Sequence, residues 1–212
     1  VNYFDTAPVY LQGQSEAAVG KALSRHPRDK YFIATKLSNQ RNSDREYSLN
    51  LYRNSFKYLQ VDYIDYLLMH SLGGDGIAKF EERFINNGML EFLEKEREAG
   101  RIRHLGWSFH GDVEVFDHLL KMHDEGKSHW DFVQIQHNYI DWKLASGRNV
   151  PSEYLYTELA KRNIPVIIME PLLGGRLSNL PDHVLARLKQ REPEKSAASW
   201  AFRYAGTMPM VL

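Results

Sequence analysis

The chain opens with Val1-Asn2-Tyr3-Phe4-Asp5-Thr6-Ala7-Pro8-Val9-Tyr10, an apolar, β-prone run that ends in a carboxylate and is followed by a tyrosine in the next turn. Two similar runs occur later in the chain, and Lys36 and His70 stand at their ends. The carboxyl ends of parallel strands meet at one edge of a sheet. We therefore predict that Asp5, Tyr10, Lys36 and His70 form one catalytic site.

Composition and charge narrow the classes of function. The 212 residues are 43% hydrophobic and 25% charged, which is ordinary for a globular domain with a sizeable core. Formal net charge is zero, and no run approaches the roughly 18 apolar residues of a membrane span, so neither a nucleic-acid partner nor a membrane partner is expected. The absence of cysteine excludes a disulfide framework and a thiol nucleophile within these residues. No metal site is predicted, and a cytoplasmic location is expected.

Strand-like and helix-like patterns alternate along the chain at intervals of about 30 to 40 residues, which predicts a parallel sheet built from βαβ units. The segment 71–88 is predicted to be a long loop, and Met210-Val211-Leu212 a strand that is cut off as it begins. The predicted strands cover residues 1–5, 31–36, 64–70, 103–108, 132–136 and 165–170. The predicted helices cover 15–24, about 45–59, 89–99, 113–123 and 153–162, and a helical region that is interrupted at Pro193 covers 181–205.

Two architectures fit this alternation: an open doubly wound sheet and a closed (β/α)8 barrel. No Gly-x-Gly-x-x-Gly follows any predicted strand, so the dinucleotide fingerprint of the open sheet is absent. Polar residues instead recur at many strand ends, which favours the barrel, because a barrel builds its site there. We expect a single barrel domain over residues 1–212. The recurring polar residues are Asp5, Lys36, His70, Ser108, Gln134, Gln136 and Glu170.

The four candidate catalytic residues suit proton transfer to a carbonyl oxygen. A free tyrosine has a pKa of about 10, and a nearby ammonium such as that of Lys36 favours the phenolate. Asp5 would hold the ammonium in place, Tyr10 would act as general acid, and His70 would hydrogen-bond the same oxygen. Protonation of a carbonyl oxygen suggests a reduction in which a nicotinamide supplies hydride.

The chain resembles the aldo-keto reductase family over essentially its whole length. The resemblance rests on several motifs that occur in the family's order. They are Tyr3-Phe4-Asp5-Thr6-Ala7 with Tyr10, Gly13 to Leu23, Ala34-Thr35-Lys36, Val61 to His70, Gly100 to Ser108, and Phe132-Val133-Gln134-Ile135-Gln136.

The resemblance implies a (β/α)8 barrel, the tetrad Asp5, Tyr10, Lys36 and His70, and a small carbonyl substrate. It also implies NADP as cofactor, with NAD as an alternative. The implied cofactor contacts are Ser108 and Gln134 at the nicotinamide carboxamide, together with Met169, Pro171 and Leu172.

Details near Ser108, Gln134 and Glu170 look closest to a bacterial branch that often carries a ferredoxin-like iron–sulfur segment. A 4Fe-4S cluster is therefore expected only in a segment outside this chain, as it needs cysteine ligands.

The sequence departs from the family pattern in three respects. Phe109 stands where many relatives have a second carboxamide-binding Asn, and Met169 where many have an aromatic residue that stacks on the nicotinamide. In addition, the chain begins at what would be the second barrel strand and ends within the last one. We therefore expect a barrel truncated at both ends, without the natural N-terminus.

Two alternatives to an enzyme stay open at this point: a non-catalytic nicotinamide-binding redox sensor, and an electron-transfer subunit on the same fold. The substrate pocket is expected to involve the loops 71–88 and 137–152, and the sequence does not identify the substrate. It does not indicate the oligomeric state either.

Overall fold

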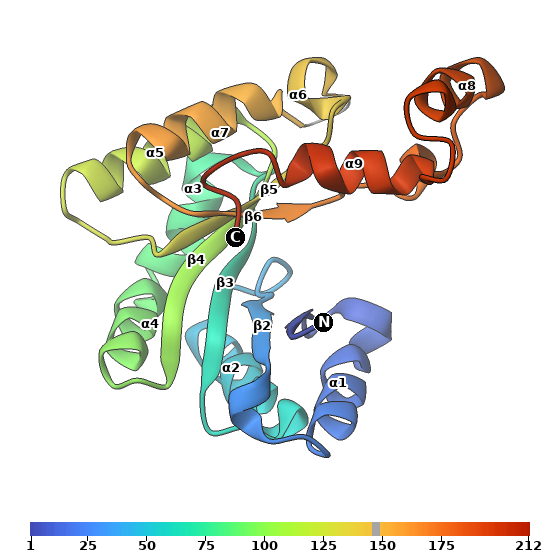
Figure 1. Ribbon diagram of the computed structural model, residues 1–212. Helices are drawn as coiled ribbons and strands as arrows, with labels where there is room; N and C mark the ends of the chain where they lie inside the picture. The colour runs from blue at the N-terminus through green and yellow to red at the C-terminus, as the bar shows by residue number, and fades with distance from the viewer. Residues whose placement is uncertain (146–148) are drawn as a thin grey trace. The chain divides into compact units, whose positions relative to one another are not determined.

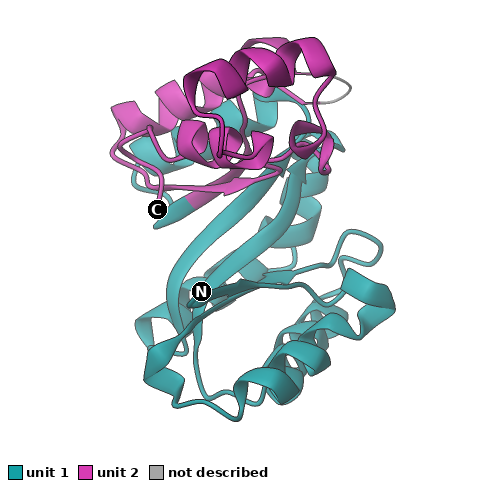
Figure 2. Cartoon of the chain, turned by 45° about the vertical axis from the view of Figure 1, so that its right-hand side comes forward, with its two compact units in different colours: residues 1–132 teal, residues 133–212 magenta. Residues whose placement is uncertain are grey.

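The computed structural model describes residues 1–145 and 149–212. Three residues of the expected pocket loop 137–152 thus lie outside the described residues. The chain forms two compact units, residues 1–132 and residues 133–212 (Figure 2). The first unit contains all the candidate catalytic residues, and the second contains most of the candidate cofactor contacts.

The strands of the first unit pair in parallel and in chain order (Figure 1). They are β1 (Tyr3–Asp5), β2 (Phe32–Leu37), β3 (Ile64–Gly73) and β4 (Ile102–His110). Asp5 is the last residue of β1, and in the β2–β3 ladder Lys36 pairs with Leu68, two residues before His70. This register brings the carboxyl ends of three neighbouring strands to one edge of the sheet.

Helices connect these strands, and the sequence explains several of their boundaries. Asp44 is the N-cap of α2 (Arg45–Leu59), where its carboxylate accepts the backbone N–H of Tyr47 at 2.9 Å. Gly100 follows α4 (Met89–Glu98) with a φ of 77°, the left-handed conformation that favours glycine after a helix. The helical elements of this unit are η1 (Tyr10–Gly13), α1 (Ser15–Leu23), η2 (Arg28–Lys30), α2 (Arg45–Leu59), α3 (Gly76–Phe80), η3 (Glu81–Ile85), α4 (Met89–Glu98) and α5 (Val113–Asp124).

Gly20 lets α1 and α2 pack closely. A Cβ built at this position would lie 2.1 Å from the carbonyl oxygen of Tyr58 in α2, so any larger side chain would push the two helices apart. Beside this contact, Leu23, Ile33 and Leu59 are buried in one cluster. The packing fixes α1, the helix that follows the loop carrying Tyr10.

The prediction of a long loop over 71–88 is wrong. Strand β3 continues to Gly73, which pairs with His110 of β4, and most of the remaining residues form α3 and the π-helical turn η3. Phe80 and Phe84 are buried and stack with ring centroids 6.0 Å apart. These short helices have too few residues for a helical period to show in the sequence, and their glycines suggested a loop instead.

In the second unit, β5 and β6 run parallel, with Val133 paired with Val166 and Gln136 with Met169. The predicted strand at the end of the chain is reduced to one parallel bridge between Val166 and Val211. The elements of this part are β5 (Phe132–Gln136), α6 (Asp141–Leu144), α7 (Ser152–Lys161), β6 (Val166–Met169), η4 (Arg176–Ser178), α8 (Asp182–Arg191) and α9 (Ala197–Ala205). The first residue of β5 belongs to the first unit.

The parallel strands and the helices between them confirm the predicted α/β class and the βα order. Closure into a (β/α)8 barrel and a single domain over residues 1–212 stay predictions.

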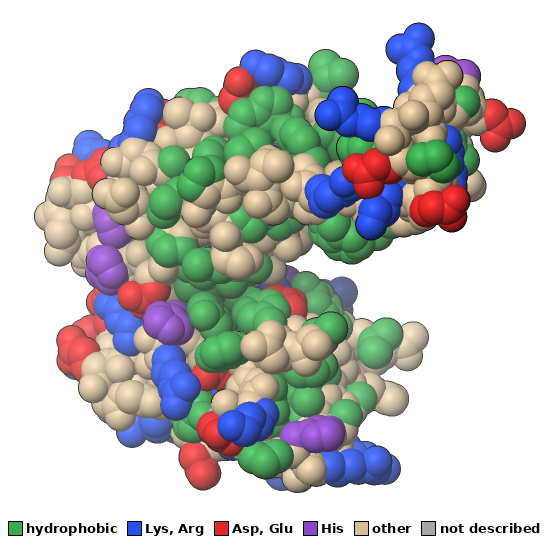
Figure 3. All heavy atoms as spheres, in the orientation of Figure 1, with side chains coloured by type: hydrophobic (Ala, Val, Ile, Leu, Met, Phe, Trp, Pro, Cys, Tyr) green, Lys and Arg blue, Asp and Glu red, His purple; other side chains and the backbone are tan. Residues whose placement is uncertain are grey.

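Charged side chains of both signs are interspersed on the face shown in Figure 3, and the α8–α9 segment is an example. There Arg203 forms an ion pair with Glu192 at 2.7 Å. In the part of the chain that the structure describes, every helix is too short or too polar to cross a membrane.

Candidate active site

Lys36 is the buried centre of the candidate tetrad. Its side chain is 1% exposed, and its ammonium forms an ion pair with Asp5 and donates to the backbone carbonyl of Thr6 at 2.8 Å. The side chain of Asp5 is 27% exposed and so retains access to water. Two acceptors, one on the last residue of β1 and one on the residue after it, therefore fix the position of the ammonium at the end of β2.

Tyr10 lies beside this ammonium. The Nζ atom of Lys36 is 4.7 Å from the centre of the phenol ring, and the ring meets His70 edge to face at 5.8 Å. Leu11 and Gln12 have positive φ angles of 49° and 57°, so the chain turns sharply directly after Tyr10. Because 39% of Tyr10 is exposed, the aromatic ring is held on one side and open to solvent on another.

His70 is the buried member of the group on β3. Its Nδ1 atom lies 2.6 Å from Oγ of Ser38, which follows Lys36 by two residues. Burial lowers the pKa of His70 to about 3, and the positive charges of Lys36 and Arg83, with His110, act in the same direction. His70 is therefore a neutral imidazole at physiological pH.

This pKa predicts how stability depends on pH. An unfolded histidine titrates near 6.5, so below that pH the unfolded state binds a proton that native His70 does not. The contribution of His70 to the free energy of unfolding is therefore fully present above about pH 6.5. It falls by about 1.4 kcal/mol per pH unit as the pH falls toward 3. The free energy of unfolding, measured with urea at several pH values, should depend less steeply on pH for His70→Gln than for the unchanged protein. The exposed His183 supplies the control variant His183→Gln, which should keep the original slope.

The structure gives Ser108, a predicted cofactor contact, a local partner. Its Oγ accepts the backbone N–H of Ser71 at 2.8 Å, which leaves the hydroxyl hydrogen to be donated elsewhere. The neighbouring Phe109 is 2% exposed and packs against Trp107 and Phe116, with ring centroids 6.2 and 5.1 Å away. Phe109 is thus a core residue in this unit.

The other predicted cofactor contacts lie in the second unit. Gln134 is buried within β5, Met169 ends β6 and is half-buried, and Pro171 and Leu172 follow in a turn. Glu170 shapes this turn, because its carbonyl accepts the N–H of Leu173 at 3.0 Å and its carboxylate accepts the N–H of Gly174. The carboxylate of Glu170 therefore organises the loop after β6.

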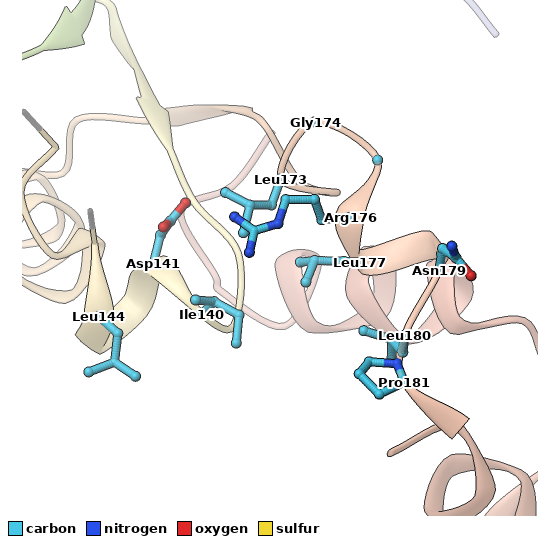
Figure 4. Close-up of a pocket in the computed structure, with 11 residues that line it drawn as sticks. Ile140, Asp141, Leu144, Leu173, Gly174, Arg176, Leu177, Asn179, Leu180 and Pro181 are labelled. Atoms are coloured by element: carbon cyan, nitrogen blue, oxygen red, sulfur yellow. The ribbon is translucent and has the colours of Figure 1, made fainter. Parts of the chain in front are cut away.

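Each unit has a groove next to predicted site residues. In the first unit a groove of about 640 Å³ is lined by Val9, Gln12, Gly13, Ser38, Gln40, Arg41 and Tyr47. In the second, Leu173, Arg176 and Leu177 face Ile140 and Leu144 across a groove of about 680 Å³, shown in Figure 4. The first groove adjoins Tyr10, and the second begins directly after Leu172.

Sequence reasoning missed two residues that hold His70: Ser38 at its ring and Arg83 at its backbone. The guanidinium of Arg83 donates to the carbonyl oxygen of His70 at 2.6 Å. Ser38 directly follows β2, and its position in the sequence does not pair it with His70, which is 32 residues away. Nothing in the local pattern around Arg83 indicated burial. In residues 1–145 and 149–212, no group of three or more potential ligands is placed to hold a metal ion.

The sequence profile of the Aldo/keto reductase family matches residues 1–211. The chain belongs to this family. Aldo-keto reductase YhdN of Bacillus subtilis is 36% identical over 116 residues, which are 51% of this chain and 33% of that relative. The chain thus matches about a third of the length of this curated relative.

Solved structures agree with the family assignment. An aldo/keto reductase from Brucella melitensis is 25% identical, has a TM-score of 0.74, and is matched over 100% of this chain and 72% of its own. An aldo-keto reductase from Klebsiella pneumoniae, solved in complex with NADPH, has a TM-score of 0.73 at 22% identity, with 100% and 68% covered. At 22% identity, the likeness to the Klebsiella pneumoniae structure shows a shared fold alone.

Proposed function

We propose that this chain carries the catalytic residues of an NAD(P)H-dependent reductase that converts an aldehyde or ketone to an alcohol. The observation that carries the proposal is the position of a buried ammonium, fixed by Asp5, at 4.7 Å from the ring of the exposed Tyr10. Family membership supports the same reaction class.

In this proposal Tyr10 gives its hydroxyl proton to the carbonyl oxygen of the substrate. The ammonium of Lys36 stabilises the phenolate that remains, and Asp5 and the carbonyl of Thr6 keep the ammonium in place. We assign the hydroxyl of Ser38 as the donor to Nδ1 of His70, 2.6 Å away. In this proposal the neutral ring then carries its hydrogen on Nε2 and donates it to the same oxygen. The bound nicotinamide supplies the hydride.

Ser108, Gln134, Met169, Pro171 and Leu172 are the proposed contacts of NADPH. The fit of Ser108 rests on its remaining hydroxyl hydrogen, which suits a carboxamide oxygen. The backbone turn after Met169 is held by Glu170, and the groove beyond it contains the positive charge of Arg176, which suits a phosphate.

The test of this function follows the absorbance of NADPH and NADH with a panel of aldehydes and ketones, using the whole protein. Turnover that produces the alcohol supports the reductase. Tight cofactor binding without turnover across the panel would contradict it and favour a sensor. An electron-transfer role would instead show as reduction of an artificial electron acceptor without alcohol formation.

The groove beside Tyr10 predicts a preference among carbonyl substrates. Of its described lining residues, Arg41 alone carries a charge, and the others are mostly polar. A substrate with a carboxylate should therefore react better than a neutral one. We expect Arg41→Met to lower kcat/KM for 4-carboxybenzaldehyde about fivefold and to leave benzaldehyde nearly unchanged, as befits a solvent-exposed ion pair. The exposed Arg25 supplies the control Arg25→Met. Equal effects on both aldehydes would contradict this role.

A further inference from the structure

Arg83 is a buried arginine next to the candidate active site. Only 2% of it is exposed, although it lies in the short π-helical turn η3. Its guanidinium donates to three acceptors: the carbonyl oxygens of His70 at 2.6 Å and Ser71 at 3.4 Å, and Oδ1 of Asn39 at 3.0 Å. Within the described residues, no carboxylate oxygen lies within ion-pair distance of Arg83. The guanidinium is thus directed at two backbone carbonyls and one side-chain amide rather than at an opposite charge.

Asn39 fixes the direction of this guanidinium. Its side-chain amide returns a hydrogen bond to the carbonyl oxygen of Arg83 at 3.0 Å and donates a second one to Oγ of Ser48 at 3.1 Å. Asn39 is fully buried and lies three residues after Lys36. Hydrogen bonds in both directions between Asn39 and Arg83 therefore connect the loop after β2 to the turn η3, next to the C-terminal part of β3.

The backbone that Arg83 contacts is irregular. Ser71 has a φ of 52°, and the ladder between β3 and β4 changes register between Met69 and Leu72. The carbonyl oxygens of His70 and Ser71 consequently lie at an irregular point of the ladder, where they accept hydrogen bonds from side chains. Gln40 adds a bond to the carbonyl of His70 at 3.3 Å, and Ser108 accepts the N–H of Ser71.

Burial of a guanidinium without an ion-pair partner is unfavourable, and it lowers the pKa of Arg83 to about 10, although the negative charges of Asp75 and Glu82 act in the opposite direction. A neutral donor could satisfy one carbonyl, whereas the forked guanidinium spans two consecutive carbonyls and a side-chain amide at once. The arrangement is therefore suited to holding one peptide segment in a single conformation.

We propose that Arg83 is a positioning residue, which holds the irregular His70–Ser71 backbone so that the imidazole of His70 stays directed at the reacting carbonyl. The catalytic part of this inference rests on the proposed reductase function. The positioning part concerns only the native conformation of His70.

The experiment compares Arg83→Met and Arg83→Lys with the unchanged protein, each checked for folding by circular dichroism. The exposed Arg53 in α2 supplies the matched control Arg53→Met. The first readout is the ¹H–¹⁵N spectrum of the His70 ring, assigned with His70→Gln. The second is the separate measurement of kcat, KM for the aldehyde and Kd for NADPH.

We expect Arg83→Met to shift or split the ring signals of His70 and to lower kcat by about tenfold to a hundredfold, with Kd for NADPH within about twofold. Arg83→Lys keeps the charge and can reach one carbonyl. Its kcat and its His70 signals should therefore lie between those of the unchanged protein and those of Arg83→Met. If Arg83→Met does not fold, Arg83→Lys and Asn39→Ala carry the test, since each weakens the same contacts.

Unchanged His70 signals with unchanged kcat in a folded variant would overturn the inference. Uniform loss of active protein with unaltered kcat per folded molecule would also overturn it, since that result indicates a purely structural role. If the unchanged protein lacks turnover while the His70 signals still move in Arg83→Met, the reductase proposal fails and the positioning role stands.

Discussion

Tyr10→Phe is expected to lower kcat for aldehyde reduction by a factor of about 10² to 10⁴, the range for loss of a general acid. The substitution removes only the hydroxyl. The ring keeps its edge-to-face contact with His70 and its position beside the ammonium of Lys36. Folding stability and NADPH affinity should therefore change little, and the loss should appear in kcat rather than in KM.

The measurement pairs steady-state kinetics with a fluorescence titration of NADPH, so that turnover and binding are read separately. Tyr58 offers a matched control, because it is 42% exposed against 39% for Tyr10 and lies on helix α2. Tyr58→Phe should keep the original kcat. A Tyr10→Phe variant with nearly full turnover would show that the proton comes from another group.

The sequence was sufficient for the order of the strands and of the longer helices. Strand β5 matches its prediction over Phe132–Gln136, and helix α1 begins at Ser15 as expected, because both segments have clear apolar patterns and clear breaks. Residues 71–88 were mispredicted for a physical reason. Gly73 pairs in a ladder despite its φ of 114°, and the helices α3 and η3 are each a single turn or slightly more.

For the candidate site, the sequence predicted only which strand ends carry polar residues. Asp5, Lys36 and His70 could be brought together by that rule, and the structure does place them with Tyr10. The contact of Ser38 with His70 joins residues 32 apart in sequence, and that of Arg83 joins residues 13 apart across a strand end and two turns. Such bonds depend on tertiary packing, for which no local pattern exists. The carboxylate of Glu170 likewise serves a loop that only the folded chain defines.

Lys36→Met is expected to damage activity and stability together, but through separable causes. In the proposed reaction the ammonium stabilises the phenolate of Tyr10, so its loss is expected to lower kcat by about 10² or more. It also leaves the carboxylate of Asp5 and the carbonyl of Thr6 without their buried donor. Because Asp5 is 27% exposed and can be solvated, we expect a loss of about 1–3 kcal/mol in the free energy of unfolding, below that for a fully buried pair.

The double variant Asp5→Asn with Lys36→Met separates the two causes. Removing the carboxylate charge as well should restore part of the free energy of unfolding, measured with urea, while kcat stays at the level of the single Lys36→Met variant. The exposed Lys57 in α2 provides the control Lys57→Met, which should change neither quantity by much. Recovery of kcat in the double variant would mean that the ammonium acts only by neutralising Asp5, and the phenol would then need a different source of activation. Since the Nζ atom lies 4.7 Å from the ring centre of Tyr10, we expect the loss of turnover to persist.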